Sequence, residues 1–301
     1  MAISFLISLI AAIASPLVFG FMNVMDKYVI SKKVKTVLSY TALAGFVNIG
    51  IGIILSLFLD WSGIALKDMI LPSIAGILFG SQFFFYFIML KKEDVSNVIG
   101  LMYTYPLVVA LLSFLFLNEV LSLIGYLGVA FIMLGIVTMS VRRKKVKLKS
   151  GIWMLINLIL VVGLSEFFIK FATVNIPTFN GIAINTFVMG LTVILVLLGK
   201  KTRKGFTNEL KNIRWAVFAE SFTFLGIITL YVAMTNMPAT IVSSIAAIQP
   251  LIVLIFERLF NRFSGGMVKD DVIMRKLIPI SFIVIGVILI YSNEIVKMMG
   301  K

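Results

Sequence analysis

The sequence predicts an all-α, polytopic membrane protein with ten transmembrane helices in two inverted five-helix repeats. Three observations support this fold class: the composition, the number of long apolar segments, and a pattern that occurs twice. Of the 301 residues, 60% are hydrophobic, and the mean hydropathy is +1.10. Soluble domains are usually about 45–50% apolar. So large an apolar surface requires lipid as its solvent.

The long apolar segments define the expected spans, because about 20 apolar residues cross the hydrocarbon core as a helix. We expect spans at residues 3–26, 38–59, 70–90, 95–117, 122–141, 150–173, 181–199, 214–236, 239–260 and 277–293. The first segment is interpreted as a span and not as a cleaved signal peptide, because no basic residue precedes Lys27. The connections are short, and none could hold a soluble domain.

The basic residues predict the orientation in the membrane. Of the 27 Lys and Arg, all but Lys67, Lys170, Lys297 and Lys301 fall on the side that receives the connections after the odd-numbered spans. Cytoplasmic loops carry an excess of Lys and Arg. We therefore expect that side to be cytoplasmic, both termini to lie on the other side, and the chain to be a multi-pass protein of the plasma membrane.

The pattern that occurs twice is centred on Pro106 and Pro250. "DVSNVIGLMYTYP" ends at the first proline, "MPATIVSSIAAIQP" ends at the second, and an apolar run follows each. Residues 1–145 and 146–301 therefore look like two copies of five spans that form one membrane domain. Because five is odd, the copies enter the membrane from opposite sides, as in many secondary transporters.

The two prolines are predicted to be helix hinges beside a cavity. A proline inside a span frees the carbonyl four residues earlier, here that of Met102 or Ala246. Such backbone is tolerated at membrane depth only where it is buried in protein or lines a cavity. A simple packing kink is the alternative interpretation.

These features resemble the EamA-like branch of the drug/metabolite transporter superfamily. "YTYPLVVALLSFLFLNEVLSLIGYLGVAFIMLGI" looks like the fourth and fifth helices of that family, with Glu119 at the position of its glutamate. Lys27 and Lys170 resemble lysines found late in its first and sixth helices. The second half departs from the pattern, because Phe263 stands where the matching glutamate is expected and Glu257 comes earlier. The resemblance implies transport, often export, of a small metabolite such as an amino acid or an amine.

Charged residues inside spans are functional candidates, because they are costly there. Glu166 has Lys170 one helical turn later, so it is either a substrate-binding carboxylate or half of an ion pair that only holds the helix in place. Glu220 has no charged residue one turn away, and we favour it as the proton-coupling group, with Glu166 as the contact for a cationic group. Asp26 lies near the end of the first span and is expected to reach the interface. Glu257 is expected to be structural.

The uncharged polar residues within spans complete the predicted site. The substrate-binding candidates besides Glu166 are Asn23, Gln82, Tyr103, Thr104, Ser243, Ser244 and Gln249. Tyr103 and Thr104 follow Gly100 at helical spacing, which predicts that they share one helix face. Small and hydroxylated residues also serve ordinary contacts between helices in lipid, and Gly76 and Gly80 are expected to do only that. Part of the aromatic run 83–86 could face a cavity and suit an aromatic or cationic ligand.

Several function classes are disfavoured by what the sequence lacks. The chain has no Cys and no His, which removes thiolate metal sites and the commonest general base, so we expect no enzyme, no metal and no cofactor. There is no Walker motif, and the basic residues form short loop clusters, which disfavours binding of nucleic acid. We predict a secondary transporter that works by alternating access on a small-molecule substrate, with possible proton coupling, as a monomer or homodimer. A channel or facilitative pore is the alternative.

Overall fold

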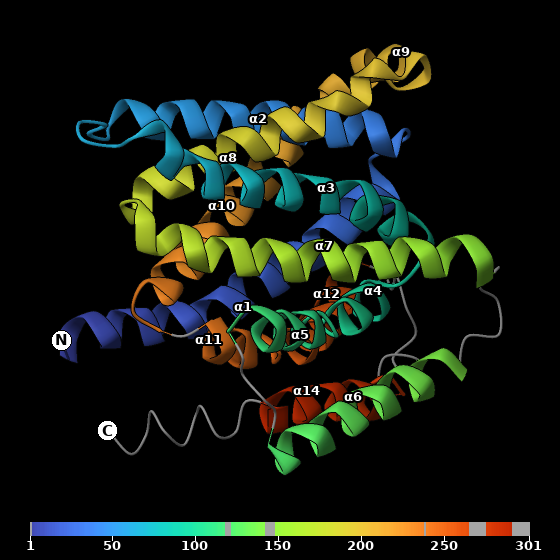
Figure 1. Cartoon of the computed structure of the whole chain (residues 1–301). Helices are drawn as coiled ribbons and strands as arrows, with labels where there is room; N and C mark the ends of the chain where they lie inside the picture. Colours follow the sequence, from blue (N-terminus) through green and yellow to red (C-terminus); the bar gives the residue numbers. More distant parts are fainter. Residues whose placement is uncertain (1, 118–121, 142–147, 238, 265–274, 291–301) are drawn as a thin grey trace.

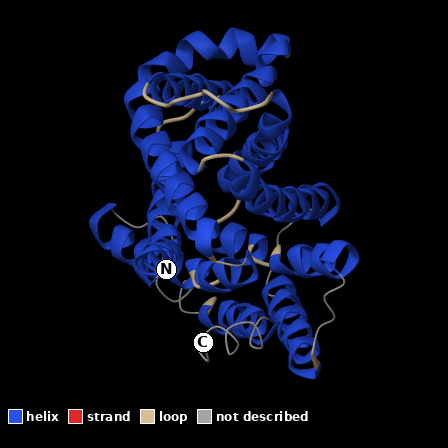
Figure 2. Ribbon diagram, turned by 60° about the vertical axis from the view of Figure 1, so that its left-hand side comes forward, coloured by secondary structure: helices blue, strands red, loops and turns tan. Residues whose placement is uncertain are grey.

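The structure is a computed structural model that describes residues 2–117, 122–141, 148–237, 239–264 and 275–290. Within these ranges the chain forms helices, turns and short connections, and no residue is in a strand (Figure 2). This confirms the all-α prediction for the described part of the chain. The long helices are α1 (Ala2–Lys32), α2 (Val37–Leu57), α3 (Ile70–Lys92), α6 (Leu123–Val141), α7 (Leu148–Asn175), α8 (Thr178–Ile194), α10 (Ile213–Asn236) and α14 (Leu277–Ile290).

Shorter helices lie between and beside these. They are α4 (Val95–Met102), α5 (Pro106–Leu117), α9 (Lys200–Glu209), α11 (Ala239–Ala246), α12 (Gln249–Ser264) and three 3-10 turns, η1 (Leu66–Met69), η2 (Leu195–Leu198) and η3 (Leu210–Asn212). Among the described residues, six helical segments are long and apolar enough to cross a membrane: Ser4–Lys32, Val37–Leu57, Leu66–Lys92, Trp153–Val174, Thr178–Leu198 and Lys200–Asn236. The chain is thus a polytopic membrane protein.

The expected fourth and ninth spans are not continuous helices. The segment 95–117 is divided into α4 and α5, and the segment 239–260 into α11 and α12. Pro106 is the first residue of α5 and Pro250 the second residue of α12. A proline fits the first turn of a helix because no helical partner exists there for its missing N–H, and it disfavours helical backbone in the residue before it. Each proline therefore starts a new helix instead of bending an existing one.

The break before Pro106 changes two predictions. The Met102 carbonyl is not left free, because it accepts a hydrogen bond from the Tyr105 backbone N–H at 3.0 Å. The Thr104 N–H bonds to the carbonyl of Leu101 at 3.2 Å in the same way. The Tyr103 N–H still bonds to the carbonyl of Ile99 at 3.0 Å, as in an α-helix, so the α-helical pattern that would place Tyr103 and Thr104 on one face with Gly100 ends between these two residues.

The helices pack in pairs around a central group of four. Figure 1 shows α2 and α8 together at one edge of the molecule and α6 and α14 together at the opposite edge. Between them, α1 packs along α10 and α3 along α7. The broken helices lie beside α1 and α7, so their breaks face the middle of this group. The largest cluster of buried side chains draws on all of these helices, and Val287 and Ile290 are its members from α14.

Glycines set the closest helix contacts. A methyl group at Gly76 or Gly80 of α3 would lie 2.6 or 2.7 Å from backbone carbonyls of α8, which agrees with the packing role expected for this pair. At the edge pair, a Cβ at Gly128 of α6 would lie 2.4 Å from the carbonyl of Gly286 in α14. The two backbones therefore touch directly, as small residues allow in membranes.

We expect Gly128→Leu to destabilise the protein by about 1–3 kcal/mol, because the side chain would have to displace helix backbone. The measurement is the melting temperature of the purified protein in detergent. Gly50→Ala is the matched control, since a Cβ at Gly50 meets nothing within 4 Å. A Gly128→Leu protein that melts with the Gly50→Ala control would show that α6 and α14 do not pack through these glycines.

Candidate functional site

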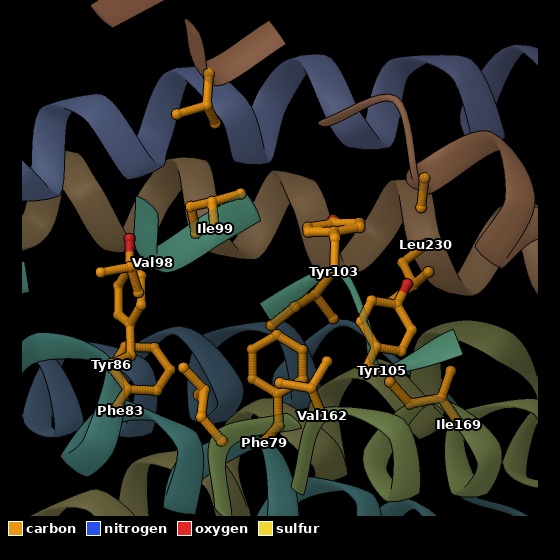
Figure 3. Close-up of a cluster of buried hydrophobic side chains, with 14 of the residues drawn as sticks. Phe79, Phe83, Tyr86, Val98, Ile99, Tyr103, Tyr105, Val162, Ile169 and Leu230 are labelled. Carbon is orange, nitrogen blue, oxygen red and sulfur yellow. The ribbon is translucent and has the colours of Figure 1, made fainter. Parts of the chain in front are cut away.

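The central group of helices lines a cavity of about 70 Å³, which is large enough for a few water molecules. The lining residues come from six helices and one break, and they are Phe19, Met22, Asn23, Asp26, Phe79, Gln82, Phe83, Tyr86, Met102, Tyr103, Tyr105, Val162, Glu166, Thr223, Leu230 and Gln249. We call this cavity the chamber. Figure 3 shows Tyr103 and Tyr105, from the break between α4 and α5, entering the same space as Phe79 and Val162 from two other helices.

A chain of hydrogen bonds runs along the chamber wall and ends at Asp26. The Tyr103 hydroxyl donates to Oε1 of Gln249, and Nε2 of Gln249 donates to Oδ1 of Asn23 at 2.7 Å. Nδ2 of Asn23 donates to the hydroxyl of Tyr86 at 2.7 Å, and that hydroxyl donates to Oδ2 of Asp26 at 3.1 Å. Every donor points toward the carboxylate, so each bond polarises the next in favour of a negative charge on Asp26.

The same chain joins parts that lie far apart in the sequence. Tyr103 belongs to the break between α4 and α5, and Gln249 begins α12 just after the break that follows α11. The hydrogen bond between them therefore ties the two breaks together. Asn23 then connects both to α1, and Tyr86 extends the network to α3.

Glu166 stands on the α7 side of the chamber and is 8% exposed. Its Oε2 accepts a hydrogen bond from the Ser243 hydroxyl at 2.9 Å, and the Tyr105 side chain lies against the same carboxyl group. Lys170 does not pair with it. Nζ of Lys170 donates instead to the carbonyls of Met234 and Met237, at 2.7 and 2.9 Å.

The ion pair between Glu166 and Lys170 that was one of the two sequence interpretations is therefore wrong. The reason is the end of α10, whose last carbonyls have no partner within the helix. A lysine near such an end satisfies them and interacts favourably with the helix dipole. This leaves Glu166 in contact with hydroxyl groups.

Glu220 is 1% exposed in α10 and does not line the chamber directly. Its Oε2 accepts a hydrogen bond from Nδ2 of Asn48 in α2 at 2.8 Å. Asp26 is close enough to interact with it electrostatically. Thr223, one turn after Glu220, reaches the chamber, and its hydroxyl contacts Sδ of Met22 at 2.8 Å. Glu220 thus lies directly behind the wall that carries Asp26.

The structure brings five of the eight predicted substrate-binding residues into the chamber lining. They are Asn23, Gln82, Tyr103, Glu166 and Gln249. Thr104 is buried but not in the lining, and its hydroxyl bonds to the Leu101 carbonyl at 2.9 Å. Ser243 lies behind Glu166. The side chain of Ser244 and all of Glu119 fall outside the described residues.

Sequence reasoning assigned Asp26 to the interface, and this was wrong. Asp26 is 2% exposed and lines the chamber. The expected first span ended at residue 26, whereas α1 continues to Lys32, which places Asp26 well inside the helix. Its position three residues after Asn23 was the available signal, because residues at this spacing share a helix face.

Aromatic residues were also only partly foreseen. Phe83 and Tyr86 from the aromatic run face the chamber, together with Phe79 one turn earlier, which the sequence did not single out. The rings of Phe79 and Phe83 lie 6.5 Å apart between centroids, and those of Tyr103 and Tyr105 lie 5.3 Å apart. The chamber is therefore walled by rings from two directions.

A second group of charges lies outside the chamber. Nζ of Lys276, at the start of α14, contacts Oδ2 of Asp94 at 2.8 Å and the hydroxyl of Ser96 at 2.9 Å. Glu257 of α12 is 1% exposed beside Lys276 and Ser96. This cluster joins the start of α4 to α12 and α14, which agrees with a structural place for Glu257.

Comparison with known proteins gives one family. The profile of the EamA-like transporter family matches residues 6–141. No curated protein matches. Among solved structures, 28 chains match, and one of them, described only as "Crystal structure of protein", is 15% identical with a TM-score of 0.63 over 100% of both chains. At that identity the likeness shows the fold alone. Residues 6–141 are thus similar to the EamA-like transporter family, and the resemblance predicted from the sequence is confirmed over that part of the chain.

Proposed function

We propose that this protein is a secondary transporter that carries a small metabolite across the plasma membrane by alternating access. The observation that carries the proposal is the chamber, a largely apolar space between helices from both halves of the chain that contains a few polar and acidic side chains, with a helix break on either side of it. Irregular backbone at membrane depth is typical of substrate sites in transporters, where such breaks face a cavity.

Matching contacts in the two halves support an inverted repeat. Nζ of Lys27 donates to the carbonyls of Leu90 and Glu93 at the end of α3, both at 2.7 Å. Lys170 makes the same two contacts at the end of α10, again with carbonyls three residues apart. The family match ends at residue 141, close to the predicted boundary between the halves at residues 145 and 146.

This arrangement supports alternating access. Two inverted halves that meet at a central site can open it to one side or the other by rocking. Cross-half contacts such as those of Gln249 with Tyr103 and Asn23 would break and form again during that motion. Glu166 would contact the substrate, and Glu220, behind the wall, would exchange protons.

Counterflow in proteoliposomes tests the carrier against a pore. Vesicles are loaded with unlabelled solute, and uptake of a labelled trace from outside is followed. Unlabelled solute on the far side stimulates uptake by a carrier, because the loaded carrier returns faster, whereas it does not stimulate a channel. Uptake that is independent of internal solute would favour the channel or facilitative pore.

The prolines give a further test of the mechanism. Pro106→Ala and Pro250→Ala can each restore a backbone N–H and favour a continuous helix across the break. We expect both proteins to fold. Their counterflow rates should differ several-fold from the wild-type rate, in either direction. Pro16→Ala, at a proline inside the continuous helix α1, is the control. Wild-type rates in both break variants would remove the hinges from the mechanism.

A further inference from the structure

We propose that the chamber selects small organic cations and that Asp26, rather than Glu166 alone, anchors them; this rests on the proposed transport function. The first observation is the balance of charge. The chain has a net charge of +14, yet the chamber lining contains two carboxylates, Asp26 and Glu166, and none of the described lining residues is Lys or Arg. The chamber lining is therefore acidic, whereas the chain as a whole is basic.

The neighbouring lysine does not neutralise Asp26. Lys27 follows it in the sequence, but its Nζ is directed to the carbonyls of Leu90 and Glu93. The salt bridge between Lys276 and Asp94 lies outside the chamber. A buried carboxylate without a cationic partner is costly, and the cost is removed when a cation or a proton arrives.

Asp26 has one oxygen ready for a ligand. Its Oδ2 accepts the hydrogen bond from Tyr86, whereas Oδ1 is buried and has no hydrogen-bond partner among the described residues. All the hydrogen bonds from Tyr103 through Gln249 and Asn23 donate in the direction of this carboxylate. They hold it in place and leave Oδ1 free to contact a positively charged group.

The rings suit a cation better than a neutral solute. Phe79, Phe83, Tyr86 and Tyr103 line the chamber, and ring faces attract a cation most strongly where water is excluded. Glu166 adds a second carboxylate on the α7 side. A zwitterion such as an amino acid would bring its own carboxylate into a lining without Lys or Arg. The amides of Asn23 and Gln249 already donate within the chain of hydrogen bonds. The lining therefore favours a simple cation over a zwitterion.

The test uses three molecules of similar shape and different charge. Choline is a cation, 3,3-dimethylbutan-1-ol is its neutral isostere, and glycine betaine has the same ammonium group with a carboxylate. Binding to the purified full-length protein is measured by thermal shift and calorimetry in detergent. We expect choline to bind at least about tenfold more tightly than either of the others, a difference of about 1.4 kcal/mol. Equal binding of the isostere, tighter binding of betaine, or no binding of choline would overturn the proposal.

Variants test the anchor. Asp26→Asn should weaken choline binding at least tenfold while the neutral isostere is unaffected. Glu257→Gln is the matched control, because this buried carboxylate lies outside the chamber and should leave binding unchanged. Wild-type affinity in Asp26→Asn would overturn the role of Asp26. If that variant does not fold, Phe79→Leu, which keeps the charge and removes a ring, should weaken choline more than the isostere, and equal weakening of both would count against the proposal.

Transport is measured separately, so that the two proposals can fail separately. If choline binds to the protein but shows no counterflow, the result would support the cation site and contradict the proposal that the protein is a carrier. Counterflow of betaine or of the neutral alcohol, without binding of choline, would leave the carrier in place and contradict the cation site.

Discussion

Glu220→Gln is expected to abolish accumulation driven by a pH gradient and to leave counterflow exchange at the wild-type rate. Glutamine has the shape of the protonated acid and can still accept the hydrogen bond from Asn48, so the packing behind the chamber wall is kept. It cannot release a proton. Coupling through this residue would therefore be lost, while exchange of solute would remain.

The measurement is uptake of labelled choline, or of any solute that shows counterflow, into proteoliposomes with and without an imposed pH gradient. Glu220→Asp keeps a titratable carboxyl group and is the control that should retain some accumulation. Full gradient-driven accumulation in Glu220→Gln would remove this residue from coupling. Glu166, Asp26, a lysine, or a carrier without coupling would then be the remaining explanations.

Lys27→Met and Lys170→Met are each expected to lower the free energy of unfolding by about 2–5 kcal/mol. Each lysine satisfies two carbonyls at the end of a neighbouring helix, and an unpaired, partly buried carbonyl costs about 1–3 kcal/mol. Methionine has a similar length and apolar character but no donor. The melting temperature in detergent should therefore fall by several degrees in both variants.

Lys67→Met is the control for loss of a charge alone, since Lys67 is exposed in η1. If Lys27→Met melts together with this control, the contacts at the end of α3 contribute nothing measurable. A fall in only one of the two test variants would show that the matching contacts of α3 and α10 differ in strength.

Much of the fold followed from simple rules. Long apolar segments predicted α1, α2, α3, α7, α8 and α10 close to where they lie. The breaks were harder to predict, because Pro106 and Pro250 stand in apolar runs that read equally well as kinked helices. Where the helix starts again depends on turns such as that of Tyr105 with Met102, which composition does not reveal.

For the site, the sequence indicated which residues are involved but not which partners they contact. Asn23, Gln82 and Gln249 were found because polar residues in apolar spans are conspicuous. The partners could not be found, since Lys170 prefers carbonyls 64 and 67 residues away over an acid one turn away. Asp26 was assigned to the interface because the first span was expected to end at residue 26. The helix α1 ends six residues later, at Lys32, and Asp26 is therefore buried.

The bond between Tyr103 and Gln249 also has a consequence for fluctuations. Local opening at one break must sever this bond and so loosens the other break, which lies in the opposite half of the chain. Under the proposed alternating access, we therefore expect the two breaks to open together, and the frequency of this joint opening would limit how often the chamber can change the side to which it is accessible.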